Sequence, residues 1–453
     1  MYLAYSVLTL LIFVLISPYF AYQAIRYKKH IGSLRERLGY LPISFNLDGE
    51  ESIWIHAVSV GEALTARALA ADLKSRYPRL RLFLSTTTIS GQQVARASLG
   101  RVVDAVFYFP LDWAFIVRRT LNLVKPRLFI TIETEIWPNL LRECRRRGVK
   151  TAVINGRISA RSYPRYRLIR PFFRRVLSDV DRFCMQSEES ARRLIDLGAD
   201  PARVTMTGSL KFDSLEAPAS ASGAGAAHGK PRERLLRFFR ISSNRIVIVA
   251  GSTMRGEEAS VLKAFKRVKD TRSHVLAILA PRQPERFAEV AALAREAGFV
   301  TARRSELPID AEPRADVVVL DSLGELAHLY QVATVVFVGG SLADHGGHNI
   351  LEPAIFGKPV IFGPHMQNFK EIAETFVANG AAIQVRSDQE LDDTILALVR
   401  DPVQRARLGA AARALVEANR GAKGKTLAAI QDLLPPVGSG GAGGVVRPFR
   451  RVH

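Results

Sequence analysis

The chain repeats one alternation of short β-branched runs and longer helical patterns in each of its halves. In the first half, strands are predicted near residues 53–58, 82–86, 105–109, 128–132, 151–154 and 182–186, with helical stretches such as 61–77 between them. In the second half, they are predicted near 245–250, 274–279, 316–320, 334–338 and 359–362. Strands that alternate with helices form parallel sheets with helices on both faces. We therefore predict an α/β fold with two Rossmann-like domains.

The segments outside this alternation set the domain boundaries. Residues 217–231 are small and rich in Gly, Ser and Ala, a composition typical of a linker. We expect one domain at 26–216, a second at 232–425, and a helix end with a flexible tail at 426–453. Ligands of such sheets bind beyond the carboxyl ends of the strands. The natural site is therefore a cleft between two facing domains.

The N-terminal segment is apolar enough to predict a membrane anchor over 1–25. These residues carry no charged side chain, and Leu3–Ala21 is almost wholly apolar; about 20 such residues cross a bilayer. Positive charge follows at Arg26, Lys28 and Lys29, which places the remaining chain on the cytoplasmic side. Pro18 also allows a partly inserted helix, and a buried core helix is the alternative.

The formal net charge of +21 indicates a polyanionic partner. Twelve basic residues and one acid lie within Arg142–Arg175, which predicts either a surface for anionic lipid or a solvated helix face. Nucleic acid is disfavoured because no helix-turn-helix, zinc-finger or RNA-sheet motif accompanies the charge. The two cysteines, Cys144 and Cys184, exclude a disulfide scaffold and a four-cysteine zinc site.

Charged residues in the first half follow predicted strands. Gly61 can turn the chain so that Glu62 lies in the first helical turn, where it is a candidate general base or an ordinary helix-dipole residue. Glu133 and Glu135 are two apart at a strand end, so we expect them on one side, with helix capping as the alternative. Lys211 is a candidate partner for a negative leaving group, or a surface lysine.

The second half combines glycines, Arg and Glu in a pattern that suits a nucleotide. Ala250–Thr253 provides small residues and hydroxyls before a helix, where backbone N–H groups can approach an anion. Arg282 can contact phosphate through two hydrogen bonds. Glu352 can bind ribose hydroxyls or form a variant capping box with Asn349. Dehydrogenase and ATPase functions are disfavoured, since no G-x-G-x-x-G turn or phosphate loop follows the first strand of either half.

Several separated motifs resemble those of the bacterial 3-deoxy-D-manno-octulosonic acid (Kdo) transferases of lipopolysaccharide synthesis. The resemblance extends from the N-terminus to about Lys425. Its motifs are His56–Glu62, Glu133–Asn139, Asn155–Ser159, Thr207–Asp213, Ala280–Phe287, Ser322–Leu326 and Gly346–Ala354. It implies a GT-B fold and an inverting, metal-independent transfer of Kdo from CMP-Kdo to a lipid A precursor (lipid IVA), with no cofactor. It also implies a phosphorylated disaccharide acceptor at the cytoplasmic face of the inner membrane.

The resemblance also implies roles for individual residues. Glu62 matches the catalytic base, and Glu133 and Lys211 match a pair that stabilises the transition state. The matching CMP-binding residues are Pro281, Arg282, Leu323, Gly324, Glu325, Asn349, Ile350, Leu351 and Glu352. Gln283 replaces an expected His, and Leu323 an expected Met; neither departure removes a charged group. A glycosyltransferase with another sugar nucleotide, or a non-catalytic membrane-surface adaptor, is the alternative.

Overall fold

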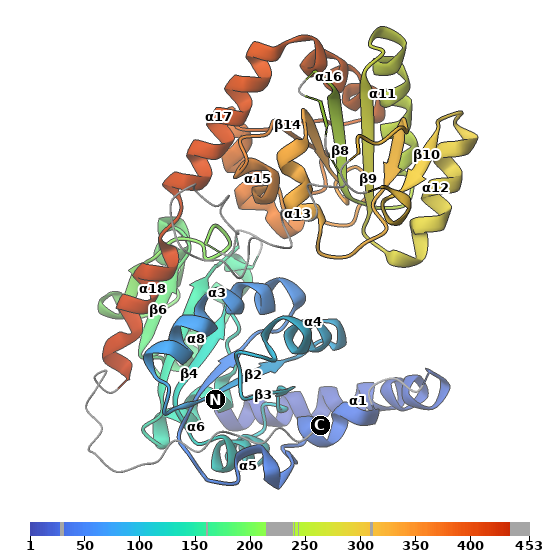
Figure 1. Ribbon diagram of the computed structural model, residues 1–453. Coiled ribbons are helices and arrows are strands. Elements are labelled where there is room, and N and C mark those ends of the chain that lie inside the picture. The colour runs from blue at the N-terminus through green and yellow to red at the C-terminus, as the bar shows by residue number, and fades with distance from the viewer. Residues whose placement is uncertain are drawn as a thin grey trace. The chain divides into compact units, whose positions relative to one another are not determined.

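The computed structural model describes residues 1–27, 31–159, 162–213, 239, 241–242, 244–308 and 311–434. The chain divides into two compact units: unit 1 is Met1–Ser214 with Arg420–His453, and unit 2 is Leu215–Asn419. Each unit contains one seven-stranded sheet (Figure 1). The two predicted Rossmann-like domains are therefore present. The predicted linker at 217–231 lies outside the described residues, as does the tail after residue 434.

The sheet of unit 1 is entirely parallel and has the order β3-β2-β1-β4-β5-β6-β7. Its strands are β1 (Ser52–His56), β2 (Arg81–Thr86), β3 (Ala105–Tyr108), β4 (Pro126–Ile132), β5 (Lys150–Gly156), β6 (Arg182–Met185) and β7 (Val204–Met206). The helices are α1 (Tyr2–Tyr27), α2 (Ile31–Arg37), α3 (Val60–Arg76), α4 (Ile89–Leu99), α5 (Ala114–Val124), α6 (Pro138–Arg146), α7 (Tyr163–Leu168), α8 (Arg170–Leu177) and α9 (Glu188–Asp196).

Alternate residues of the central strands supply two different cores. Trp54 and Phe129 belong to an aromatic core shared with α5 and α6. Ile55 and Ile130 belong to an aliphatic core shared with α3 and α4 on the other face. Side chains alternate across a strand, so a strand that is buried on both faces must be apolar throughout. This burial explains why these strands are readable as continuous apolar runs in the sequence.

The C-terminal helix α18 (Ala422–Ile430) completes unit 1. It contacts β6 and α3, and its Leu427 and Ile430 join the aliphatic core. The Asp213 carboxylate accepts hydrogen bonds from the backbone N–H groups of Gly421 (2.8 Å) and Lys423 (2.6 Å). The chain therefore returns to the first unit at Arg420, a few residues before the boundary expected at 425.

The sheet of unit 2 is also parallel and has the order β10-β11-β9-β8-β12-β13-β14. Its strands are β8 (Ile246–Thr253), β9 (Val275–Pro281), β10 (Thr301–Arg303), β11 (Val317–Val319), β12 (Val335–Val338), β13 (Val360–Phe362) and β14 (Ile383–Gln384). The helices are α11 (Glu257–Thr271), α12 (Phe287–Glu296), α13 (Leu326–Leu329), α14 (Leu351–Ala354), α15 (Lys370–Ala378), α16 (Asp388–Arg400) and α17 (Pro402–Ala418).

The predicted membrane anchor is the point where the structure departs from the sequence interpretation. Residues 1–25 do form a helix, α1. Within the described part of the chain, however, no helix is both long and apolar enough to cross a membrane. One side of α1 instead packs on unit 1: the Tyr2 hydroxyl donates a hydrogen bond to Asp179, and Asn139 donates one to the Ser6 hydroxyl at 3.0 Å. The anchor is therefore not supported.

Candidate functional site

Glu62 lies in the first turn of α3, directly beyond the carboxyl end of β1. Ser59 is the N-cap of that helix. The Glu62 carboxylate accepts a hydrogen bond from the Val58 N–H at 2.7 Å and one from the Ser59 hydroxyl at 2.9 Å. Only 7% of the residue is exposed. Glu62 therefore has the first-turn position of the alternative interpretation, yet a carboxylate has about four acceptor positions and can still take a proton.

Glu133 and Glu135 lie in a turn rather than on a strand. β4 ends at Ile132, and Glu133 has the left-handed φ of 60°. The prediction placed both carboxylates on one side of a strand, and this reason is wrong because neither residue belongs to the strand. They are nevertheless close enough for Glu133 to raise the pKa of Glu135, after the larger effect of burial. A non-glycine residue in this conformation costs about 1–3 kcal/mol and is found most often at functional sites.

Lys211 reaches Glu133 from a different part of the chain. Its ammonium Nζ is 3.5 Å from the Glu133 carboxylate. The loop that carries it is held by Asn155, whose side-chain oxygen accepts a hydrogen bond from the Leu210 N–H at 2.9 Å. Asn155 also has a left-handed φ, of 53°. Two residues from separate motifs are thus brought together, as the sequence predicted for the pair Glu133 and Lys211.

The pKa of Glu62 is raised by its surroundings. Burial, and after it the negative charge of Glu133, raises the pKa of Glu62 to about 7. The hydrogen bonds from Val58 and Ser59 oppose this rise, and Glu135 adds to it. A base is most effective when its pKa is near the working pH. Strongly shifted pKa values in such clusters are typical of functional sites.

His56 is a buried neighbour of this cluster that the sequence analysis did not single out. Its ring stacks on Phe109 with centroids 3.7 Å apart, and Nδ1 is 3.0 Å from the Ser85 hydroxyl. Burial lowers its pKa to about 3, so the imidazole is neutral at physiological pH. Within the described residues Nε2 has no hydrogen-bond partner. In the sequence, a single histidine at a strand end cannot be distinguished from an ordinary residue of the core.

In unit 2, Arg282, which follows β9, and Glu352, in the single turn of α14, interact electrostatically. Pro281 ends β9, and Arg282 follows it. The positive charge of Arg282 lowers the pKa of Glu352, against the larger raising effect of burial. It also lowers the pKa of His348, which burial brings to about 4. An arginine, a neutral histidine and a buried carboxylate therefore share one end of the sheet.

The remaining predicted nucleotide residues divide into exposed and buried ones. Leu323 is 74% exposed, and Gly324 has a positive φ of 83°. Glu325 pairs with Arg304 through two hydrogen bonds of 2.9 Å, a partner that the sequence did not reveal. Ile350 and Leu351 are fully buried and belong to the core, so neither offers an exposed group to a ligand.

The capping box predicted for Asn349 is not formed, because the N-cap of α14 is Ile350 and no side chain caps that helix. The side chains of Asn349 and Glu352 nevertheless interact. Asn349 accepts a hydrogen bond from the Leu351 N–H at 3.1 Å. Its side-chain amide donates to Glu352 at 3.2 Å. The helix that follows, α14, is a single turn. The contact with Asn349 is compatible with ligand binding, because it uses one oxygen of the Glu352 carboxylate.

The glycine-rich loop after β12 binds the carboxylate of Glu257, a residue of the same unit. The Glu257 carboxylate accepts hydrogen bonds from the N–H groups of Met254, Gly340, Ser341, Leu342 and Ala343 at 2.7–3.2 Å. The backbone N–H groups of Gly340 and Ser341 are therefore occupied by this carboxylate and are not free for a ligand. Because Glu257 lies more than eighty residues before the loop, sequence spacing gives no hint of it.

Glu257→Gln is expected to lower the free energy of unfolding of unit 2 by about 3 kcal/mol. The side chain is 2% exposed, and an amide would place its own donor group against the backbone N–H donors. Hydrogen bonds to a charged group contribute about 1.5–3 kcal/mol each, and a buried donor left unpaired costs as much again. Urea unfolding followed by circular dichroism measures the change. Glu296→Gln, on the exposed end of α12, is the matched control and should leave the midpoint unchanged.

The basic segment Arg142–Arg175 is partly engaged within unit 1. Arg146 pairs with Glu143 at 2.8 Å, Arg145 with Asp179 at 3.6 Å, and Lys150 with Asp181 at 3.6 Å. These pairs reduce the charge that is available to an anionic surface. The lipid-binding interpretation of the segment therefore stays a prediction.

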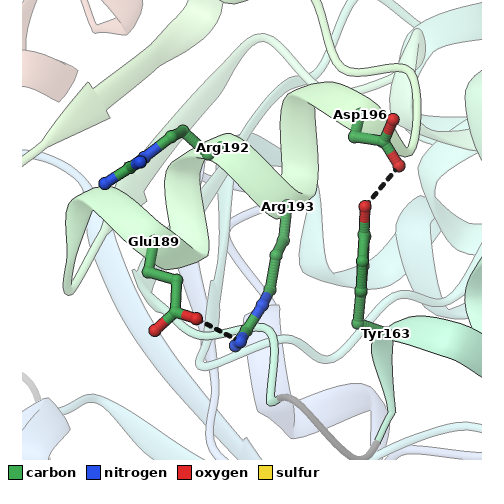
Figure 2. Close-up of a pocket in the computed structure, with 5 residues that line it drawn as sticks. All are labelled: Tyr163, Glu189, Arg192, Arg193 and Asp196. Carbon is green, nitrogen blue, oxygen red and sulfur yellow. Dashed lines mark hydrogen bonds and ion pairs between the residues drawn. The ribbon is translucent and has the colours of Figure 1, made fainter.

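A separate polar hollow of unit 1 is shown in Figure 2, with a volume of about 600 Å³. Arg193 donates hydrogen bonds to Glu189 and to the Ile158 carbonyl (2.8 Å), and the Tyr163 hydroxyl donates to Asp196 at 2.6 Å. The Arg193 guanidinium is held by the Glu189 carboxylate, so the hollow is poorly suited to a phosphate. Its contact with Ile158 braces the Asn155–Ser159 motif instead.

Both units match family models of sugar-transferring enzymes. Residues 32–214 match a family model described as 3-deoxy-D-manno-octulosonic-acid transferase (kdotransferase), and residues 259–415 match glycosyl transferases group 1. The 3-deoxy-D-manno-octulosonic acid transferase of Haemophilus influenzae is 35% identical over 415 residues, which cover 89% of this chain and 91% of the relative. The enzyme of the same name from Bordetella pertussis is 36% identical, over 84% and 87% of the two chains.

Solved structures with a similar fold include a UDP-GlcNAc 2-epimerase from Neisseria meningitidis bound to UDP-GlcNAc. It has a TM-score of 0.56 and 12% sequence identity, and the match covers 84% of this chain and all of that one. At this identity the similarity concerns the fold alone. It agrees with the predicted arrangement of two Rossmann-like domains.

Proposed function

The chain belongs to the 3-deoxy-D-manno-octulosonic acid (Kdo) transferase family, and on that premise we propose that this glycosyltransferase moves Kdo from CMP-Kdo to a lipid A precursor. The proposed reaction inverts the anomeric centre, needs no metal and releases CMP. Its acceptor is a phosphorylated, acylated disaccharide such as lipid IVA, reached at the cytoplasmic face of the bacterial inner membrane. The observation that carries the proposal is the buried Glu62, whose pKa is raised to about 7 beside the pair Glu133 and Lys211.

In the proposed step, Glu62 takes the proton of the acceptor hydroxyl. The acceptor oxygen then forms a bond to the anomeric carbon of Kdo while the bond from that carbon to the CMP phosphate breaks, and CMP leaves with the electron pair. Positive charge develops on the sugar ring as this happens. The Glu133 carboxylate and the Lys211 ammonium provide fixed charges for the ring and the leaving phosphate, which is the form of stabilisation with the largest effect in many enzymes.

The donor is proposed to bind in unit 2. Arg282 suits the phosphate of CMP because a guanidinium can donate two parallel hydrogen bonds. Glu352 suits the ribose hydroxyls, since its buried carboxylate has one partner at Asn349 and a nearby positive charge at Arg282. The backbone around Gly324, which has a positive φ of 83°, completes the proposed contact surface.

Transfer by the purified, detergent-solubilised protein tests the proposal. CMP-Kdo would be generated in situ and supplied with a tetra-acylated lipid A precursor in the presence of EDTA, and the product mass measured. A mass increase of one or more Kdo units supports the donor, the acceptor and metal independence together. If both substrates stay intact and a UDP-sugar is used instead, another nucleotide-sugar donor is favoured; binding without turnover of any donor favours the adaptor.

Arg282→Ala is expected to raise the KM for CMP-Kdo by roughly 10–100-fold, because hydrogen bonds between charged groups contribute about 1.5–3 kcal/mol. The KM for the lipid acceptor should change little. Initial rates at varied CMP-Kdo concentration measure the effect. Arg295→Ala, at an exposed position of α12, is the control. An unchanged KM for the donor in Arg282→Ala would place the phosphate elsewhere.

A further inference from the structure

A second cavity of unit 1 lies under α1 and has a volume of about 240 Å³. Its walls come from α1, from the connection between β3 and α5, and from the start of α6. Most of the lining is apolar or aromatic: Ile12, Phe13, Ile16, Leu111, Trp113 and Trp137. The volume equals that of about eight water molecules at roughly 30 Å³ each. An apolar lining of this kind favours an apolar ligand over water.

Polar contacts fix the walls of this cavity. The Trp113 indole donates a hydrogen bond to the Thr9 hydroxyl at 3.2 Å. The Phe13 and Trp113 rings pack edge to face, with centroids 5.1 Å apart. Nearer the start of the helix, the Ser6 hydroxyl accepts a hydrogen bond from the Asn139 side chain. The cavity is therefore a formed site, and α1 is held in place above it.

The mouth of the cavity continues into an exposed apolar surface. Ile12 and Ile16, which line the cavity, are 45% and 42% exposed. On the same helix Leu11 is 57% and Leu15 is 79% exposed. Large apolar side chains exposed together on one helix are typical of an interaction site. An alkyl chain can thus pass from this surface into the cavity without leaving an apolar environment.

The inner end of the cavity is the loop of the candidate active site. Trp137 is the N-cap of α6 and follows Glu135 by two residues. Its ring packs against Phe109, with centroids 4.8 Å apart, and Phe109 stacks on His56. Among the described residues, the buried indole nitrogen of Trp137 has no hydrogen-bond partner. A ligand in the cavity therefore lies against the segment that carries Glu133.

Asp112, at the base of the cavity, ties this wall in position. Its carboxylate accepts hydrogen bonds from the N–H groups of Asn139 (3.0 Å) and Leu140 (2.8 Å) at the start of α6. Burial raises its pKa to about 7, which agrees with a site that excludes water. The Asp112 carboxylate at the base of the cavity thus already has protein partners.

We propose that this cavity binds a segment of one acyl chain of the acceptor and so positions the acceptor hydroxyl at the active site. The proposal rests on the proposed function, since it requires an acylated acceptor. The occupant is an alkyl chain because the lining is apolar, the mouth opens on exposed leucines and isoleucines, and the inner wall belongs to the catalytic loop.

The kinetic test fills the cavity by the double substitution Ile12→Phe/Ile16→Phe. The KM for a tetra-acylated acceptor should rise roughly tenfold, because burying each methylene group contributes several-fold to affinity. The KM for an O-deacylated acceptor and the KM for CMP-Kdo should stay unchanged. Leu3→Phe/Val7→Phe is the matched control: it introduces two phenylalanines with the same spacing on the same helix, at residues that are 78% and 49% exposed and do not line the cavity.

A binding measurement separates failure of this site from failure of the proposed function. Trp113 and Trp137 line the cavity, whereas the third tryptophan, Trp54, is fully buried in the core. A dibrominated alkyl detergent should quench their fluorescence saturably in the wild type and the control, and much less in Ile12→Phe/Ile16→Phe. Saturable quenching without Kdo transfer would support the site and overturn the proposed function. Equal quenching in all three proteins, or an equal rise of KM in both variants, would overturn the site.

Discussion

Glu62→Gln is expected to lower kcat for Kdo transfer by about 10²–10⁴-fold, the usual contribution of a general base. The amide is nearly the same size as the carboxylate but cannot take a proton from the acceptor hydroxyl. Binding of CMP-Kdo should be largely retained, because the proposed donor residues lie in unit 2 while Glu62 lies in unit 1. Single-turnover rates together with calorimetric donor binding measure the two effects separately.

The loss in this variant is not expected to come from misfolding. The new amide can accept the hydrogen bond from Val58 and donate one to Ser59, the two partners of the carboxylate. A neutral amide is also less costly to bury than a charged carboxylate. Circular dichroism and the thermal midpoint provide the check. A well-folded Glu62→Gln protein with near wild-type turnover would rule out Glu62 as the base.

The pH dependence gives a second, independent measure of the same role. The base must be ionised, so kcat of the wild type should fall by roughly tenfold per pH unit below a pKa of about 7. Glu135→Gln removes one of the negative charges that raise this pKa. In that variant the fall of kcat on the acidic side of the pH profile (the acidic limb) should therefore move to lower pH, while most of the maximal rate remains. A limb that does not move would mean that another group controls the profile.

The central strands could be predicted from the sequence because each is buried on both faces, and an apolar run such as 128–132 has few alternatives. All the predicted strands are present in the structure. The three that were missed, β7, β10 and β14, are two or three residues long and lie at the edges of their sheets. An edge strand needs no continuous apolar run, because one side of it has no neighbouring strand, so its sequence looks like a loop.

The candidate site was predictable to the extent that its residues follow strand ends. Parallel strands end at one edge of a sheet, and this rule alone brings Glu62 near Glu133. The rule does not specify backbone conformation, so the left-handed turn at Glu133 was missed. It also gives no information about long-range partners such as Glu257 for the glycine-rich loop and Arg304 for Glu325. These pairs depend on tertiary packing, which local patterns do not record.

The N-terminal helix shows the limit of composition as evidence. Its apolar content predicted an anchor, but hydropathy averages over the whole surface of a helix. The few polar side chains that matter, Tyr2, Ser6 and Thr9, lie on the side that contacts unit 1. Their positions mark the side of the helix that packs on the sheet domain, whereas the leucines between them are exposed. A segment of this kind can therefore serve the folded domain and a lipid ligand with different faces.

Lys211→Met and Glu133→Gln are each expected to lower kcat by about 10²–10³-fold, the cost of removing one preorganised charged group from a transition state. The two groups form an ion pair 3.5 Å apart, so their effects should not add. Lys211→Met leaves Glu133 unpaired beside Glu62, which raises the pKa of the base further and costs additional rate at neutral pH.

Rates of the double variant Lys211→Met/Glu133→Gln test whether the two residues act as a unit. Because the second substitution removes the charge that the first one left unpaired, the double loss should be smaller than the product of the single losses. The expected coupling between contacting groups is about 0.5–3 kcal/mol. The acidic limb should also move to higher pH in Lys211→Met and return toward lower pH in the double variant. Strictly multiplicative losses with no such movement would show that Lys211 and Glu133 act on the reaction separately, and that their ion pair only stabilises the loop.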